Sequence, residues 1–535
     1  NLISVAFAVL FVGLGVDFGI QFSVRYRDSR RDDPDITGAL RHAAKTVGGP
    51  LLLAAGSTAA GFYSFLPTAY SGISELGLIA GTGMLIAFAT SVTLLPALIA
   101  VLKPPAEAEE IGFAALAPVD RFLTRHSLWI VGATLGAIVV GAPLLLKLQF
   151  DFNPINLRSP KTESVSTLLD LMRDPNDTPN TIEVLTPNLA QATELAAKIA
   201  KVPEVAQTRT LQSFIPTGQD DKLAVIQDAS FFLQNTLNPQ VKPAPSDADD
   251  AAALETTARA LSDAAGETSD RPAEEARRLG ALLGGLAHAP ASKRAILRDA
   301  IVKPLLMTLD TVRSLLQAAP VTLDDLPQSL KAEWIAGDGE ARIEVAPSGD
   351  SNDNPTMRRF ADAVLGVAPE ASGAPIFVLD AAKTIVTAFW QAGLWSILSI
   401  AVLLFAVLRK PLDVALTLVP LLVAIVATLE LSVLINLQLN FANIIALPLL
   451  LGVGVAFKIY YVMAWRAGET KFLELSLTRA ILFSAMATAT AFGSLWLSRH
   501  PGTSSMGKLM ALALVTTLAA AVVFQPALLS TRKHT

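Results

Sequence analysis

The sequence predicts an α-helical polytopic membrane protein with an α/β domain outside the membrane. The chain of 535 residues is 52% hydrophobic and only 17% charged, which is too apolar for a soluble protein of this size. Nine apolar runs are long enough to cross about 30 Å of hydrocarbon, and one long polar region, 148–383, separates the fourth run from the fifth. Together these features predict a helical bundle that carries one large extramembrane domain.

Composition also excludes several classes of function. The net charge of −5 argues against a nucleic-acid partner, and the chain has no cysteine for a disulfide, a thiolate metal site or a nucleophile. No P-loop, HExxH or EF-hand pattern occurs in the sequence, so transport driven by a nucleotide would need another chain. We therefore expect neither an enzyme nor a bound cofactor or metal.

The flanks of the apolar runs predict their orientation. The runs cover 3–26, 48–67, 73–103, 126–147, 384–408, 411–435, 441–466, 476–498 and 504–530. Basic segments follow the first run ("RYRDSRR"), the fifth ("LRKP") and the seventh ("AWRAGETK"), and "STRKHT" ends the chain. By the positive-inside rule these ends are cytoplasmic, which places the polar region on the opposite side of the membrane.

The polar region shows the order strand, helix, strand twice. The first set covers 181–187, 188–200 and 206–214, and the second covers 341–347, 354–367 and 374–380. These patterns predict two small α/β lobes. Between the lobes we expect a flexible linker at 238–250. Because 250–318 is rich in Ala, Leu, Arg and Glu, we also expect a helical insertion at about 219–335.

An internal repeat is the strongest organisational signal. The apolar run from Asn1 aligns without a gap to the run from Asn440, and "LLAAGSTAAGFYSF" aligns to "LFSAMATATAFGSL" at an offset that also pairs Gly77 with Gly507. Three helices therefore recur in the same orientation, which predicts a parallel duplication as in some secondary transporters. If each half has six spans with an outer domain after its first, the complete protein has twelve spans and its N-terminal part is missing from this chain. On that scheme 1–103 holds spans four to six, 104–125 is a cytoplasmic linker, 126–147 is span seven, and 384–535 holds spans eight to twelve.

Asp17 lies in the middle of the first apolar run. On a rise of 1.5 Å per residue it is ~21 Å from Ile3 and ~12 Å from Arg25, well inside the hydrocarbon. A carboxylate at that depth costs roughly 2.5–3.5 kcal/mol, so it must face the bundle, find a partner, or stay protonated with a raised pKa. A proton relay is the favoured hypothesis, and a buried acid with only a packing role is the alternative.

The repeat suggests two partners for Asp17. Its equivalent in the second half is Ala456, and Lys458 follows two residues later. Residues two apart differ by about 200° around a helix, so only the flexible lysine stem would bring its charge to Asp17. Tyr460 shares the face of Ala456 and can donate a hydrogen bond directly. We rank Lys458 and Tyr460 equally.

Small and polar residues complete the candidate set. Thr488, which matches Thr58 in the repeat, and Thr490 are candidate hydroxyls of a proton path, although membrane threonines often bond only to their own helix. Four glycines are expected to allow close helix packing: Gly13, Gly15, Gly19 and Gly454. Glu430 lies near the outer end of its run, where we expect its side chain to extend to the membrane interface.

Three motifs resemble a known family. "GVDFGI" around Asp17, "GSTAAGF" from Gly56 and "FDFNPINLRSPKTES" over 150–164 are similar to the RND superfamily permeases of the MMPL type, and to the branch associated with hopanoid biosynthesis. The resemblance covers nearly the whole chain. It implies a proton-driven exporter in the inner membrane of Gram-negative bacteria that moves hopanoid lipids through periplasmic porter lobes toward the outer membrane, and that assembles as a homo-oligomer.

The resemblance also assigns residues. Asp17 matches the family's essential acid, and Thr488 matches a polar relay position. The sequence departs from the pattern at Ala456, where many relatives have a second Asp and multidrug pumps have a Lys. The alternatives are a sterol-sensing receptor or scaffold, a multidrug pump, which needs larger outer domains, and a protein that assists secretion.

Overall fold

The computed structural model describes residues 2–106, 112–238 and 243–532. It divides into two compact units, the first made of Asn1–Val184, Ala196–Thr208 and Glu344–Thr535, and the second made of Leu185–Leu195 and Arg209–Ile343. The first unit contains the helical bundle, and the second contains the insertion.

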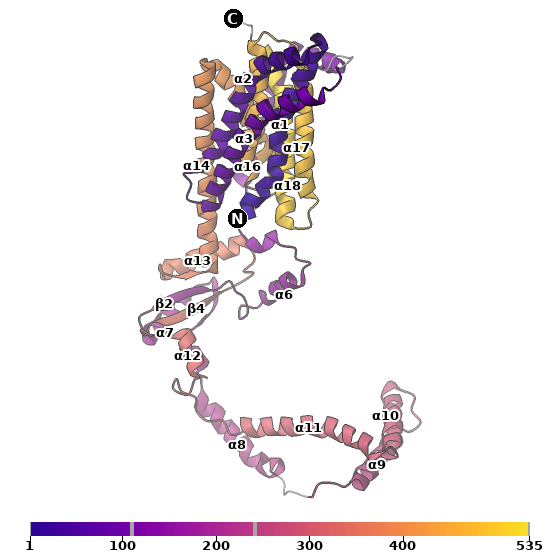
Figure 1. Ribbon diagram of the computed structural model, residues 1–535. Helices are drawn as coiled ribbons and strands as arrows, with labels where there is room; N and C mark the ends of the chain where they lie inside the picture. Colours follow the sequence, from indigo (N-terminus) through magenta and orange to yellow (C-terminus); the bar gives the residue numbers. More distant parts are fainter. Residues whose placement is uncertain (1, 107–111, 239–242, 533–535) are drawn as a thin grey trace. The chain divides into compact units, whose positions relative to one another are not determined.

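All nine apolar runs form helices in the first unit. The bundle consists of α1 (Leu2–Asp32), α2 (Ile36–Tyr63), α3 (Ser71–Leu102), α5 (Ser127–Gly141), α14 (Ala374–Leu408), α15 (Pro411–Leu434), α16 (Ala446–Arg466), α17 (Ser476–Trp496), α18 (Pro501–Ala519) and α19 (Gln525–Ser530). Among the described residues, six segments are long and apolar enough to cross a membrane: Ser71–Leu102, Ser127–Lys147, Ala374–Leu408, Pro411–Leu434, Ala446–Arg466 and Pro501–Ser530. The helices α1, α2 and α17 pack beside them (Figure 1).

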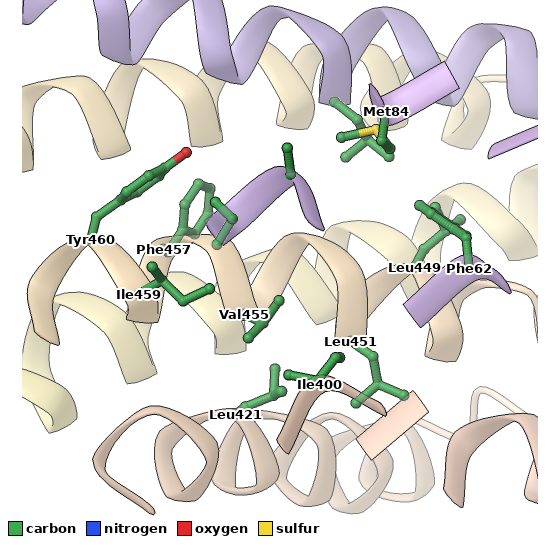
Figure 2. Packing of buried hydrophobic residues seen from close by; sticks show 14 of the residues in the cluster. Phe62, Met84, Ile400, Leu421, Leu449, Leu451, Val455, Phe457, Ile459 and Tyr460 are labelled. Carbon is green, nitrogen blue, oxygen red and sulfur yellow. The ribbon is translucent and has the colours of Figure 1, made fainter. Parts of the chain in front are cut away.

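Helix α16 forms the core of the bundle. Its long apolar side chains are inaccessible, with Val455, Phe457 and Tyr461 at 0% exposure, and Figure 2 shows how residues of α16 interdigitate with Ile400 and Leu421 from α14 and α15. Around it lie α2, α15 and α18, while α1 packs on α2, α3 and α17. A helix that is apolar on all sides is buried on all sides, which is why α16 has no amphipathic stripe.

Equivalent hydrogen bonds confirm the internal duplication. The Thr58 hydroxyl on α2 donates to the carbonyl of Gly452 on α16 at 2.9 Å, and the Thr488 hydroxyl on α17 donates to the carbonyl of Gly13 on α1 at 3.2 Å. Both donors and both acceptors are matched by the repeat. Each central helix, α1 or α16, is thus joined to the following helix of the other half.

One end of the bundle is basic. The last turn of α1 carries Arg30 and Arg31, and Arg466 in the last turn of α16 lies 3.4 Å from the buried Asp413 at the start of α15. We call this the basic end, and the opposite end, where α14 begins, the domain end. Beside the basic end lies α4 (Ala117–Arg125), whose Asp120 accepts a hydrogen bond from the Leu473 amide at 3.2 Å.

Short strands precede and follow the insertion. A four-stranded sheet has the order β3-β4-β2-β5, with β2 at Ile182–Thr186, β3 at Val205–Arg209, β4 at Ala341–Pro347 and β5 at Ser372–Gly373. Strands β2 and β5 are antiparallel and pair Ile182 with Gly373. The accompanying helices are α6 (Glu163–Leu171), α7 (Leu189–Ile199) and α13 (Asn354–Val367). At the domain end, β1 (Phe150–Asp151) pairs in parallel with β6 (Leu439–Asn440).

Two expectations for this region are wrong. The segment 374–380 is not a strand but the start of α14, because Gly373 turns the chain at a φ of 143° and Pro375 then occupies the first helical turn. The strand expected over 206–214 ends at Arg209 and is followed by a 3₁₀ turn, Leu211–Phe214. The two sets of elements therefore share one sheet instead of forming separate lobes.

The insertion is helical, as the composition indicates. It contains α8 (Gln219–Leu237), α9 (Asp247–Ala265), α10 (Arg271–Ala287), α11 (Ala291–Leu315) and α12 (Gln328–Trp334). Helix α9 begins inside the linker expected at 238–250, because Ser246 and Asp249 form a capping box. Residues 239–242 of that linker lie outside the described residues.

Candidate functional site

Asp17 is buried in the interior of the bundle. Helix α1 turns the side chain toward α2, α16 and α17, so only 7% of it is exposed. Its Oδ2 atom accepts a hydrogen bond from the Tyr460 hydroxyl at 3.5 Å, and its Oδ1 atom has no hydrogen-bond partner within the described part of the chain. A small cavity of about 10 Å³ borders it, lined by Leu14, Asp17, Phe18, Thr58, Met84, Val453, Ala456, Ser484 and Thr488. This is close to the space that a single water needs.

Of the two predicted partners, Tyr460 is the one that the structure brings to Asp17. It lies on α16, four residues after Ala456, and is 4% exposed. Figure 2 shows its hydroxyl pointing away from the α16 backbone. The hydrogen bond joins α1 to α16, the two helices related by the repeat, so a change at Asp17 acts directly on the contact between the halves.

Lys458 is not brought to Asp17. Its ammonium donates to the carbonyl of Thr517 at 2.9 Å, on α18, and the Gln525 amide donates to the Lys458 carbonyl at 2.9 Å. The side chain is at 0% exposure, and no carboxylate of the described residues forms an ion pair with it. The 200° offset from Ala456 decides this outcome, because it turns the lysine stem toward α18 and the π-helix (Ala520–Phe524) that follows it.

The two threonines are placed differently. Thr488 is buried, lines the small cavity and donates to Gly13. Thr490 lies on an exposed face and its hydroxyl donates to the carbonyl of Met486 at 2.9 Å, within its own helix. Since successive residues on a helix turn by about 100°, two positions separate the threonines by more than half a circle, and only Thr488 faces the site.

Sequence reasoning missed two residues of the site. Gln21 is 4% exposed and Ser484 is 1% exposed. Gln21 lies one helical turn after Asp17 on α1, and Ser484 lines the same small cavity as Asp17. The Nε2 atom of Gln21 and the Oγ atom of Ser484 have no hydrogen-bond partner within the described chain. Helical spacing was the available signal, because Gln21 lies four residues after Asp17 and Ser484 lies four before Thr488.

The glycines do not all permit close packing. A Cβ at Gly13 would lie 3.3 Å from the Thr488 backbone, and one at Gly454 would lie 2.6 Å from the Leu421 side chain. At Gly15 and Gly19 the nearest atoms are 3.5 Å and 3.8 Å away, which is ordinary van der Waals contact. Gly13 thus lets α1 approach α17 closely, and Gly454 lets α16 approach α15 closely. Gly15 and Gly19 leave room for a methyl group.

The expectation for Glu430 is wrong. Its side chain is 7% exposed and its carboxylate fills the space left by Gly141, where a Cβ would lie 2.6 Å from the carboxyl carbon. Packing against a glycine of the 127–147 segment keeps the side chain inside the protein, so it does not extend to the interface.

A second, larger cavity lies at the domain end. It has a volume of about 1,120 Å³ and lies among β1, α13 and the first turns of α14. Phe150, Phe152 and Leu379 line its apolar part, and the charged groups include Arg358 and Lys383. The Arg358 guanidinium lies 5.5 Å from the centre of the Phe152 ring. The cavity is amphipathic and is the size of a site for a drug-sized molecule or larger.

The duplicated bundle, its buried acid between the central helices and the strand-containing domain before α14 define a polytopic membrane protein of the RND/MMPL fold. Residues 2–144 match the model of the MMPL family. The hopanoid transporter HpnN of Rhodopseudomonas palustris (strain TIE-1) is 57% identical over 535 residues, which is 100% of this chain and 62% of the relative. The hopanoid transporter HpnN of Burkholderia multivorans (strain ATCC 17616 / 249) is 50% identical over 533 residues, 99% of this chain and 61% of the relative. The family match and the similarity to HpnN over the whole chain support an RND/MMPL-type protein that is similar to HpnN.

A solved structure shares the fold. The cryo-EM structure of the hedgehog release protein Disp from water bear (Hypsibius dujardini) superimposes with a TM-score of 0.54 at 15% identity, over 99% of this chain and 63% of that chain. At this identity the likeness concerns the fold alone. The present chain spans 61–62% of the length of the two HpnN relatives.

Proposed function

We propose that this chain is the larger part of an exporter that uses the proton gradient to move hopanoid-type lipids from the inner membrane toward the outer membrane of a Gram-negative bacterium. The observation that carries the proposal is the buried Asp17–Tyr460 contact between the two repeat-related helices, in a chain 57% identical to a hopanoid transporter. The basic end is then cytoplasmic, and the domain with the insertion is periplasmic.

Asp17 is the coupling acid in this scheme. As a carboxylate it accepts the hydrogen bond of Tyr460, and its unpartnered Oδ1 borders a cavity of about 10 Å³. Protonation removes the charge and turns one oxygen into a donor, so the carboxyl group no longer needs the tyrosine hydroxyl. A proton that binds and leaves therefore changes the contact between α1 and α16, which is how a relay acid can drive alternating access.

The cavity at the domain end is the proposed passage for lipid. A hopanoid has a rigid apolar ring system and a polar end, and the cavity of about 1,120 Å³ presents Phe150, Phe152 and Leu379 beside Arg358 and Lys383. The apolar part removes the rings from water, while the charged part accommodates the polar end. Assembly as a homo-oligomer and the role of Thr488 as a relay hydroxyl stay predictions.

Transport in proteoliposomes tests the proposal. The complete protein with Asp17→Asn is compared with wild type under an imposed pH gradient, with hopanoid transfer as the readout. Glu430→Gln is the matched control, because it neutralises another carboxylate buried in the bundle without touching the Asp17 site. We expect Asp17→Asn to abolish gradient-driven transfer and Glu430→Gln to retain it. Unchanged transfer by Asp17→Asn would refute proton coupling at Asp17 and favour a receptor or scaffold.

A further inference from the structure

The seam between α1 and α17 contains a polar track that begins at Asp17. Helix α1 runs toward the basic end while α17 runs away from it, so their residues pair in antiparallel order. Thr488 bonds to Gly13, Ser484 lines the same small cavity as Asp17, and the Ser476 hydroxyl donates to Asp28 at 3.1 Å. The polar contacts therefore follow the seam from Asp17 to the end of the helices.

Three polar atoms at the start of this seam are buried without partners. They are Oδ1 of Asp17, Nε2 of Gln21 and Oγ of Ser484, and none has a hydrogen-bond partner within the described residues. The three side chains are 7%, 4% and 1% exposed. Leaving such groups dry costs about 1–3 kcal/mol each, whereas water molecules entering the seam would satisfy all of them.

An apolar step interrupts the track. Val24 on α1 and Ala480 on α17 are 6% and 1% exposed and pack together with Ile20. They lie between Gln21 and Asp28, which is the position of a constriction. Beyond them, Arg25, Asp28, Ser29, Asp33 and His42 line a pocket of about 200 Å³ at the basic end. The distance along α1 from Asp17 to Asp28 is about 16 Å.

We propose that this seam is the route by which protons pass between Asp17 and the cytoplasm, with Gln21 and Ser484 positioning the water molecules and Val24 and Ala480 acting as an apolar gate. The inference rests on the proposed function and deepens it. When the gate is wet, the Asp17 carboxyl gives its proton to a water molecule, the charge passes along the waters to Asp28 or His42, and Asp17 is left as a carboxylate. When the gate is dry, Asp17 exchanges protons only with the other side.

The charged and titratable groups on the neighbouring helices have contacts of their own. On α16, Tyr460 contacts Asp17 from the side of the central helices, and Lys458 bonds to Thr517. On α17, the Arg479 guanidinium lies 5.3 Å from the centre of the Phe483 ring. On α1, Arg25 pairs with Asp28 at 2.8 Å. The positive charge of Arg25 at the mouth raises the local barrier to cations, so the Arg25–Asp28 pair must open or reorient for a proton to pass.

Cysteine accessibility tests whether the track is wet. The chain contains no cysteine, so Gln21→Cys and Ser484→Cys introduce single thiols into it. Phe22→Cys is the matched control, because Phe22 is adjacent to Gln21 at the same depth and is 1% exposed on the core side. A small uncharged methanethiosulfonate applied from the cytoplasmic side should modify positions 21 and 484 at least tenfold faster than position 22. Equal rates at positions 21 and 22 would overturn the proposal.

Enlarging the gate residues tests whether protons use the track. Val24→Phe should slow gradient-driven transfer at least tenfold, and Ala480→Val, a milder change from the opposite helix, should slow it in the same direction while the protein keeps its gel-filtration profile. Asp17→Asn separates the two hypotheses. If it abolishes transfer while both gate variants transport normally, the route is refuted and proton coupling stands; if Asp17→Asn transports normally, the proposed function itself fails.

Discussion

Replacing Lys458 by methionine distinguishes the two predicted partners of Asp17. The Lys458 ammonium donates to the Thr517 carbonyl at 2.9 Å and has no ion pair with a described carboxylate, whereas the Tyr460 hydroxyl contacts Asp17 at 3.5 Å. Lys458→Met should therefore leave the coupling chemistry intact. We expect its gradient-driven transfer to stay within about threefold of wild type, which corresponds to less than about 0.7 kcal/mol in activation free energy.

The same variant has a predictable effect on stability. Loss of the hydrogen bond leaves the Thr517 carbonyl without that donor, at about 1–3 kcal/mol, but methionine also removes an ammonium whose burial costs several kcal/mol. The two terms oppose each other, so Lys458→Met should denature in detergent at or above the temperature of wild type. A large loss of thermal stability would show that the buried ammonium has further partners.

Tyr460→Phe is the comparison that completes the test. It removes only the hydroxyl that contacts Asp17. Because the contact is long, we expect the activation free energy of transfer to rise by about 1 kcal/mol, which makes transfer about fivefold slower. Proteoliposomes with matched amounts of each variant give both rates. If Lys458→Met abolished transfer while Tyr460→Phe did not, the lysine would be the functional partner and the assignment from the geometry would be refuted.

Two further predictions concern the helix ends. Gly77→Ala and Gly507→Ala, at positions paired by the repeat, should each destabilise the bundle by at least about 1–3 kcal/mol, because the added Cβ would lie 2.6 Å from the Phe62 carbonyl oxygen and 2.3 Å from the Trp496 backbone nitrogen; Gly49→Ala, with no atom within 4 Å, is the control in thermal denaturation. Burial raises the pKa of the Asp120 carboxyl above its ordinary value, so the native state binds this proton more tightly than the unfolded state, and the stabilisation is present at low pH and falls as pH rises through the raised pKa. Thermal denaturation in detergent should therefore show wild type gaining stability relative to Asp120→Asn as the pH falls from 7 to 4.5; a difference between the two proteins that does not change with pH would contradict the assignment.

The site shows where inference from sequence reaches its limit. Three site residues were predictable from the sequence: Asp17, Tyr460 and Thr488. Each depends on the spacing along a helix and on the internal repeat, and the sequence shows both. Gln21 and Ser484 have the same helical spacing, but their residue types do not mark them as part of a site. A glutamine or serine in a membrane helix usually bonds within its own helix or to a partner that the sequence does not identify.

The sequence by itself determined the nine apolar helices, because burial in hydrocarbon requires long apolar helices whose backbone groups are satisfied internally. The internal repeat determined the duplication. Only the tertiary structure decided that Lys458 turns to Thr517, that Glu430 packs against Gly141 and that 374–380 continues into α14. Each of these outcomes depends on which neighbouring helix lies within reach of a side chain or a chain turn. That neighbour comes from residues distant in the sequence, so it is settled only when the helices pack.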